Sequence, residues 1–263
     1  ESHEPGPRVV QDDPLAPLAA KRSETASTPV PDDPVPQPAG DDVVGLNARL
    51  TLDFREDFET QAIKLFAKTK PGADKTRPPA VEQFSIEPAG IRVTIPNGSP
   101  VEMGRGDLRI RLQGDFQITA RYTILDLEPP TAGYGSGVGI SIQDTRGERA
   151  SLQRLVQVGG GHVFAAVHGQ PGDNGKYRYR RRLQGTSSEA LSGWMRLERV
   201  GDSIRYQIAG PRSEQFVQIH EHEFPVDDLE KVVFKNQPGA SSTAVDVIWS
   251  QFDVQAEKIV KEY

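Results

Sequence analysis

Short runs of alternating apolar and polar residues dominate the chain from Leu50 onward, and each run is bounded by Gly, Pro, Asn or Asp. A two-residue period is typical of half-buried β-strands, because successive side chains point to opposite faces. The runs are 50–54, 91–95, 108–112, 116–127, 138–142, 151–158, 162–167, 177–182, 194–200, 203–209, 216–224, 231–235 and 244–254. The runs do not alternate with helical segments. They therefore predict an all-β fold, a β-sandwich of two antiparallel sheets packed face to face.

Two local signals refine this pattern. Gly201 and Asp202 separate two of the runs, and both residue types tolerate the positive φ of a two-residue turn, so the flanking strands should form a hairpin. Residues 57–68 instead place apolar side chains at helical spacing behind several acids, which suit a helix N-terminus. A short helix is therefore one of two alternatives for that segment, and a loop is the other.

The first 45 residues differ in composition from the rest of the chain. They contain nine of the 21 prolines and no Phe, Tyr or Trp, so they have too little apolar surface to offset the entropy of ordering. Their nine acidic and three basic residues account for the whole net charge of −6. We predict that residues 1–45 form a disordered, Pro-rich acidic tail or linker and that residues 46–263 form one domain.

The remaining composition excludes several classes of site and partner. The predicted domain is electrically balanced, which gives no global reason to expect nucleic acid as a partner. The absence of cysteine excludes disulfides, thiolate nucleophiles and cysteine metal ligands. No apolar run approaches the roughly 18 residues of a membrane span. Because the chain starts at Glu1 without methionine, we expect a processed product or an excerpt. We expect the protein to act in an extracellular, periplasmic or cell-surface setting.

Several short motifs resemble those of a known superfamily. They are Asp53-Phe54-Arg55, GDFQITA at 114–120, GYGSGVG at 133–139 after Glu128-Pro129-Pro130, and GWMRLER at 193–199. Together they resemble the concanavalin A-like lectin/glucanase superfamily, and within it a bacterial family of unknown function that is frequent in planctomycetes. The resemblance covers roughly residues 50–256 and implies a jelly-roll β-sandwich. It leaves function open, because the superfamily includes lectins, glycosidases, adhesion modules and structural domains.

Paired carboxylates are the first catalytic candidates. One branch of the superfamily carries acids in an E-x-D-x-E pattern along a strand, and Asp126 and Glu128 match its second half, while Ile124 stands where the resemblance implies the nucleophile. Leu125 and Leu127 indicate a bulge that turns the leucines inward and the acids outward. Retaining hydrolysis needs two carboxyls about 5–5.5 Å apart. Because the leading acid of the pattern is missing, we expect no hydrolysis by this pair.

Two segments offer metal ligands. His220 and His222 would share one face of a strand, either as metal ligands or as packed side chains. Asp173 and Asn174 lie between glycines, where they either supply oxygen ligands for calcium or form a hairpin turn. The sequence therefore predicts no cofactor and leaves calcium open.

The most unusual stretch of the domain is KYRYRRR at residues 176–182. On a strand, one face would carry Lys176, Arg178, Arg180 and Arg182, and the other face would carry Tyr177, Tyr179 and Arg181. Guanidinium groups bind sulfate, phosphate or carboxylate, and tyrosine rings stack on sugars or cations. The alternative is an edge strand whose charges prevent aggregation.

Three other aromatic residues are candidates for a sugar platform. Tyr134 lies between glycines in a predicted turn and should be exposed, so it joins the ligand-binding candidates. Trp194 and Trp249 alternate with apolar neighbours, which predicts that both belong to the core.

Two classes of function are compatible with the sequence. The leading one is a noncatalytic binding or accessory module of a secreted or cell-surface bacterial protein, which recognises carbohydrate on its concave face. The alternative is a glycan-active hydrolase or lyase. A cleft with converging carboxylates would favour the enzyme, and a cleft lined by apolar or basic groups would favour the module. The basic stretch further predicts that an extended ligand, if there is one, is anionic.

The division at residue 45 is testable by truncation. Removing residues 1–45 should leave the melting temperature unchanged, because the tail carries no aromatic anchor. Limited proteolysis should yield a stable core that begins near residues 43–50. A fall of many degrees in the melting temperature would show that the boundary is misplaced.

Overall fold

The computed structural model describes residues 46–53, 66–67, 84–99, 103–173, 175–188, 190–213, 215–239 and 243–261. Regular structure within these ranges is entirely β-strand, which confirms the predicted all-β class. The strands are β1 (Ala48–Asp53), β2 (Phe66–Ala67), β3 (Phe84–Glu87), β4 (Gly90–Ile95), β5 (Gly104–Leu108), β6 (Ile110–Leu127), β7 (Ser136–Asp144), β8 (Arg149–Val156), β9 (His162–Pro171), β10 (Tyr177–Gly185), β11 (Ser192–Val200), β12 (Ser203–Ala209), β13 (Val217–Glu223), β14 (Leu229–Gln237) and β15 (Val245–Lys261). None of the described segments is a helix that could cross a membrane.

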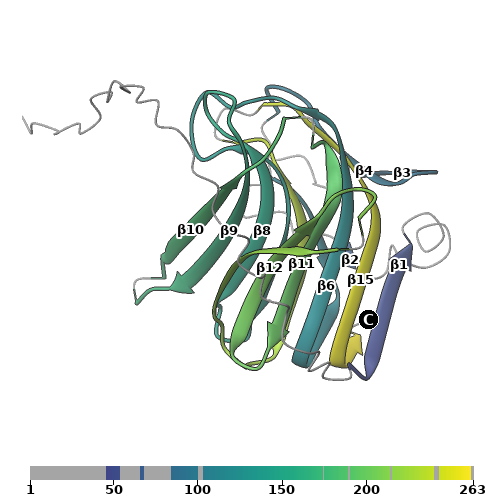
Figure 1. The fold of residues 1–263 in the computed structure, drawn as a ribbon, viewed down its shortest axis with the longest axis vertical. Helices are drawn as coiled ribbons and strands as arrows, with labels where there is room; N and C mark the ends of the chain where they lie inside the picture. The colour runs from purple at the N-terminus through teal and green to yellow at the C-terminus, as the bar shows by residue number, and fades with distance from the viewer. Residues whose placement is uncertain are drawn as a thin grey trace, which may run out of the picture. The chain divides into compact units, whose positions relative to one another are not determined.

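The strands form two antiparallel layers. The first layer has the order β10-β9-β8-β7-β14-β5-β2. The second has the order β13-β12-β11-β6-β15, with β1 and β4 both paired to β15 and β3 beyond β4. Leu229 and Leu112 form the only described pair that links β14 to β6, so the hydrogen-bonded path turns there from one layer to the other. Figure 1 shows β8, β9 and β10 side by side at one edge of the molecule.

The core lies between the layers and follows from the two-residue period of the strands. Ile140 and Leu152 from the first layer and Leu197 and Val254 from the second belong to one buried cluster. β11 packs against β7 and β8 across the interface. The antiparallel β-sandwich predicted from alternation is therefore confirmed.

The hairpin prediction is confirmed, and the helix alternative is wrong where the structure tests it. Val200 pairs with Ser203, and Gly201 adopts a φ of 58°, which a two-residue turn requires. Phe66 and Ala67 form β2 against β5, so their backbone pairs with a neighbouring strand instead of an earlier turn of a helix. Residues 57–65 and the predicted tail, 1–45, lie outside the described residues.

One of the two tryptophan predictions is wrong. Trp249 is fully buried, and its indole Nε1 donates to Asn236 Oδ1 at 3.2 Å. Trp194 is only half-buried, because β11 turns its neighbours Met195 and Leu197 inward, and Arg121 lies 5.3 Å from the centroid of the indole ring. Trp194 thus lies on the outer face of the second layer.

Arg199 joins three segments at one end of the second layer. The residue is buried, and its guanidinium donates to the carbonyl oxygens of Pro225 at 3.0 Å, Asp227 at 2.6 Å and Gly114. Its charge also lies 4.8 Å from the ring centroid of Phe116. The guanidinium therefore satisfies backbone acceptors of β6 and of the segment between β13 and β14.

Arg199→Leu should destabilise the fold by about 3 kcal/mol, because it leaves these carbonyl oxygens without donors. Urea denaturation provides the measurement. Arg212→Leu, at an exposed position, is the control and should change the free energy of unfolding by less than about 0.5 kcal/mol. A loss below about 1 kcal/mol at position 199 would contradict the bridging role.

Candidate functional site

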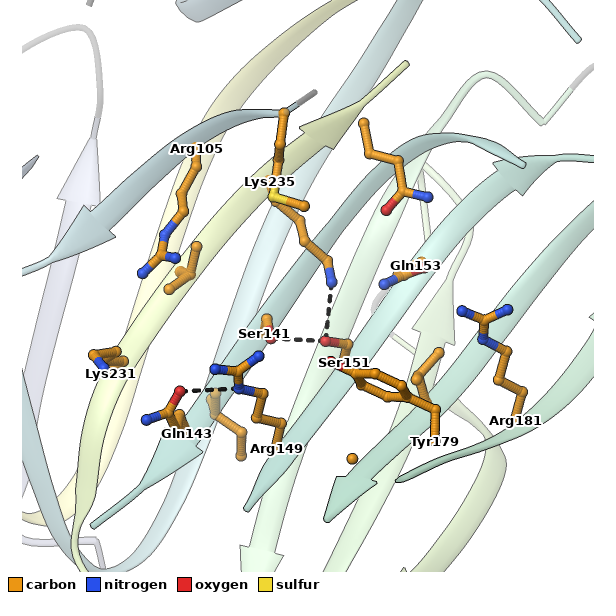
Figure 2. A pocket seen from close by; sticks show the side chains of 16 residues that line it. Arg105, Ser141, Gln143, Arg149, Ser151, Gln153, Tyr179, Arg181, Lys231 and Lys235 are labelled. Atoms are coloured by element: carbon orange, nitrogen blue, oxygen red, sulfur yellow. Dashed lines mark hydrogen bonds between the residues drawn. The ribbon is translucent and has the colours of Figure 1, made fainter. Parts of the chain in front are cut away.

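The outer face of the first layer carries a groove of about 350 Å³. Its lining residues come from the outward positions of β5, β14, β7, β8, β9 and β10 and are largely basic or amide side chains (Figure 2). The polar and aromatic ones are Arg105, Ser141, Gln143, Arg149, Ser151, Gln153, Tyr179, Arg181, Lys231, Lys235 and Gln237. We refer to this site as the basic groove.

Strand register assembles the basic groove into cross-strand rows. In the first row, Lys231 pairs with Gln143, Gln143 with Arg149, Arg149 with Gly169, and Gly169 with Tyr179. The next row runs two residues further along each strand, in the order Val233, Ser141, Ser151, Val167 and Arg181. The site therefore consists of residues that lie far apart in the chain and meet only through strand pairing.

Arg149 is held in place from two sides. Its Nε donates to Gln143 Oε1 at 2.9 Å, as the dashed line in Figure 2 marks. Its guanidinium carbon lies 3.8 Å from the centroid of the Tyr177 ring, a cation–π contact. Both partners fix the orientation of Arg149 while leaving its charge without a counterion.

Lys235 lies at the centre of the groove. The side chain is half-buried, and Nζ donates to Ser151 Oγ at 3.1 Å, while Ser151 Oγ donates to Ser141 Oγ at 2.7 Å. Burial lowers the pKa of Lys235 to about 8, and the neighbouring charges of Arg149, Arg105 and Arg181 add to the shift. The fold thus holds this amine where its positive charge is disfavoured.

Strand β10 forms one wall of the groove. The ring of Tyr179 lies over Gly169, where a Cβ would come within 2.7 Å of the ring, so this position has to be glycine for the ring to lie where it does. Tyr179 also stacks on Tyr177 with ring centroids 5.7 Å apart. Arg181 lies over the ring of Tyr134 at 3.6 Å. The wall therefore alternates aromatic faces with a guanidinium.

Carboxylates are absent from the described lining of the groove. Arg105 pairs with the neighbouring Asp107, and Lys231 lies 3.6 Å from Glu230. Within the described part of the chain, Arg149, Arg181 and Lys235 form no ion pair. The groove is consequently an electropositive surface on a domain whose composition is neutral.

The structure divides the candidates from the basic stretch between two faces. Tyr179 lines the groove, and Tyr177 stacks on it from the same face of β10. Tyr134 is exposed as predicted, with 72% of its surface accessible. Arg180 and Arg182 face a different cavity, between the layers. Arg178 alternates with Tyr177 and Tyr179 on β10, so it lies on the opposite face of the strand from them. Lys176 precedes β10. Arg181, on the tyrosine face, is the arginine of β10 that lines the groove.

The two catalytic candidates lie away from the groove. Asp126 and Glu128 are at the end of β6 in the second layer, and the pairing skips Leu125 there, which confirms the predicted bulge. The predicted inward turn of Leu125 is wrong, because this unpaired residue of the bulge is 47% exposed. Asp126 is exposed, and Glu128 accepts from Asn97 Nδ2 at 3.3 Å and from the backbone N–H of Ala244 at 3.4 Å. Ile124 is buried in the core.

The metal candidates do not form a cluster. Among the residues that the structure describes, no group of three or more His, Asp or Glu side chains is arranged to hold a metal ion. Asp173 is exposed in the turn before β10, and Asn174 lies outside the described residues. His220 and His222 do share the inward face of β13, with ring centroids 5.6 Å apart.

Sequence reasoning missed most of the groove. Arg105, Arg149, Lys231 and Lys235 are single basic residues within alternating runs, which is also the pattern of solvated strand faces. Only the strand order brings them together. The usable signal was the alternation itself, since it predicts which of these side chains lie opposite the core.

Solved structures share the fold at low sequence identity. The Crh5 transglycosylase in complex with NAG is 11% identical with a TM-score of 0.54, over 81% of this chain and 86% of that one. A structure reported under endo-acting O-glycanases of prominent members of the human gut microbiota is 10% identical with a TM-score of 0.51, over 67% and 83% of the chains. A mutant of the GH43 protein BlXynB from Bacillus licheniformis is 9% identical with a TM-score of 0.50, over 68% of this chain and 36% of that one. These likenesses concern the fold alone and agree with the predicted jelly-roll sandwich.

Sequence comparison gives a family match. The model described as "Protein of unknown function (DUF1583) C domain" matches residues 33–262. The matched range begins within the predicted tail and covers all the described strands. No curated protein matches the chain.

Lys235→Met should stabilise the protein at pH 7 by about 1–2 kcal/mol, because it removes a charge that the fold disfavours. The pKa of Lys235 is lower in the folded chain than in the unfolded one, so the gain should be full below pH 8 and disappear as the pH rises toward about 10.5. Chemical denaturation at several pH values measures it. Lys231→Met, on the same face of β14, is the control, and an equal gain there would contradict the special position of Lys235.

Proposed function

The chain belongs to the DUF1583 C-domain family, and we propose that it is a noncatalytic carbohydrate-binding module whose basic groove holds an anionic glycan. The observation that carries the proposal is the groove lining, in which Arg149, Arg181 and Lys235 converge without a described carboxylate. Guanidinium and ammonium groups bind sulfate and carboxylate substituents, which are the charged groups of acidic polysaccharides.

The length of the groove favours an extended ligand. Lys231 lies on β14 and Arg181 lies on β10, four strand spacings away in the first layer. At about 4.8 Å for each spacing, the cations span about 19 Å. A single small anion would contact only part of this row, whereas several residues of a sugar polymer would contact all of it.

The tyrosines of the groove wall suit sugar rings. Tyr179 lies in the groove with about half of its surface exposed, and Tyr134 projects beside Arg181. Flat aromatic faces bury the apolar faces of sugars, while amides such as Gln143 and Gln153 are available to bond hydroxyl groups. The groove thus combines surfaces for the ring and for the charged substituents of one ligand.

Several parts of this proposal extend beyond the groove. We place the module in a secreted or cell-surface bacterial protein, consistent with the resemblance of its motifs to a planctomycete family. Binding should need no cofactor, because cations line the groove and would repel calcium. Calcium at Asp173 would lie in the turn before β10 and not among the lining residues.

A polysaccharide lyase is the second candidate, because Lys235 has a lowered pKa within a cationic groove. A neutral amine there could remove the proton beside a uronate carboxylate, while Arg149 or Arg181 balances the charge that develops. Glycoside hydrolysis is disfavoured, since it ordinarily needs two carboxyl groups and the described lining contains none.

The binding test compares acidic and neutral polysaccharides by isothermal titration calorimetry at low salt. Uronic-acid or sulfated chains should bind, neutral β-glucans should not, and binding should weaken steeply with salt. Arg149→Gln combined with Arg181→Gln should weaken binding at least tenfold. Arg178→Gln combined with Arg212→Gln removes the same charge elsewhere and should change affinity less than about twofold. Equal losses of affinity in the two double variants would show that the basic groove is not the binding site.

An activity screen separates the two candidates. The module should release no product from uronic-acid chains or β-glucans over hours. Appearance of unsaturated sugar ends, detected by ultraviolet absorbance and abolished by Lys235→Met, would establish the lyase instead. Reducing-end release that is lost in Asp126→Asn or Glu128→Gln would establish a hydrolase.

A further inference from the structure

A second cavity lies on the other side of β10, between the two layers at their open edge. It has a volume of about 440 Å³. Its polar lining comes from three strands: His168 on β9, Arg180 and Arg182 on β10, and His220 and His222 on β13. Arg181 of β10 lines this cavity as well as the basic groove. Arg180 pairs with His168 across the first layer, so a guanidinium and an imidazole lie side by side there.

The three histidines form a packed group. The ring centroid of His222 lies 4.2 Å from that of His168 and 5.6 Å from that of His220. The ring of Tyr206 lies against both His220 and His222, at 5.7 and 5.4 Å. His168 Nε2 is 3.1 Å from Glu148 Oε2, which fixes the orientation of that ring. Residues from both layers therefore hold His222 in one position.

The polar atoms of His222 are unusual. Both ring nitrogens are buried and form no hydrogen bond with any described residue. Buried polar atoms in folded proteins nearly always have a partner, so an exception with two such atoms on one ring indicates a ligand. The ring can donate to an acceptor that enters the cavity.

The charges around the cavity determine whether it can bind a cation or an anion. Burial, together with the neighbouring His168, His220 and Arg180, lowers the pKa of His222 to about 3. Burial also lowers the pKa of His220, and Arg182 contributes. Two guanidinium groups beside three imidazoles disfavour a metal cation and favour an anion.

The facing acids do not neutralise this charge. Glu148 is engaged by His168, and Glu221 accepts from Ser203 and from Gln218 at 2.9 Å. Asp202 and Glu223 lie in the neighbouring depression that also contacts His222 and Arg180. Among the described residues neither acid forms an ion pair with Arg180, and neither contributes to the pKa shift of His222. Tyr206 is buried, which raises its pKa, so the ring is neutral.

We propose that this cavity is a second binding site, separate from the basic groove, for a small anionic group such as sulfate, phosphate or carboxylate, held by Arg180, Arg182 and His222. The site does not depend on the proposed carbohydrate function. A free anion and a charged substituent of a polymer share the chemistry that it recognises. Because successive residues of β10 face opposite sides, the strand serves the groove with Tyr179 and Arg181 and the cavity with Arg180 and Arg182.

Anion binding at this site is coupled to protons. An anion beside His220 and His222 raises their pKa values, so the complex takes up protons. Affinity should therefore rise as the pH falls from about 8 to about 5.5. Sulfate is the appropriate probe, because its own charge does not change over this range, whereas that of phosphate does.

The experiment titrates the full chain with sodium sulfate at constant ionic strength and follows the imidazole signals of the histidines by NMR. Sulfate should shift the signals of His168, His220 and His222 and leave that of His162 unchanged. Binding should tighten as the pH falls from 8 to 5.5. Arg180→Gln combined with Arg182→Gln, and separately His222→Phe, should weaken binding at least tenfold.

Two control variants keep the outcomes distinct. Arg178→Gln combined with Arg212→Gln removes the same charge and should retain sulfate binding, and so should Arg149→Gln combined with Lys231→Gln, which changes two cations of the basic groove that do not line the cavity. Thermal unfolding checks that each variant is folded. The proposal is wrong if saturating sulfate moves no signal of the three histidines, or if the Arg180 and Arg182 variant binds like the wild type. A charged oligosaccharide in place of sulfate then shows whether a polymer substituent enters the same site.

Discussion

Antiparallel pairing across the first layer is the constraint on which the candidate sites depend. Successive side chains of each strand point to opposite faces, so the register that buries Ile140 and Leu152 also presents Ser141 and Ser151 to the groove. A slip of one residue would move the core residues outward and the groove residues inward together. The large free energy of core burial therefore fixes the positions of groove side chains that contribute little stability themselves.

Sequence alone could predict the strands and their faces but not the neighbours of each strand. Alternation identified most strands, and Gly201-Asp202 identified a hairpin because the turn is local. It missed β3, β5 and the two residues of β2, which are short or rich in glycine and carry little periodic signal. Trp194 was assigned to the wrong face, although the alternation of Met195 and Leu197 indicates the correct one.

The candidate site was less predictable because its residues come from six strands. Within one strand, the sequence correctly separated Tyr177 and Tyr179 from Arg180 and Arg182, since this needs only the period of two. It could not show that the tyrosine face adjoins Arg149 and the arginine face adjoins three histidines. Those contacts depend on strand order and on the approach of the two layers, which are long-range properties of the fold.

Protection of a sheet edge explains some of the charges but not the groove. β10 pairs only with β9 among the described strands, and charged edges prevent aggregation, so edge protection alone would account for the charge of its outward arginine, Arg181. Arg149 and Lys235 lie on β8 and β14, which have partners on both sides and no edge to protect. Burial and neighbouring cations disfavour the charge of Lys235, whereas an apolar residue there would be more stable. A cation kept at a position where it weakens the fold is best explained by an anion that it binds.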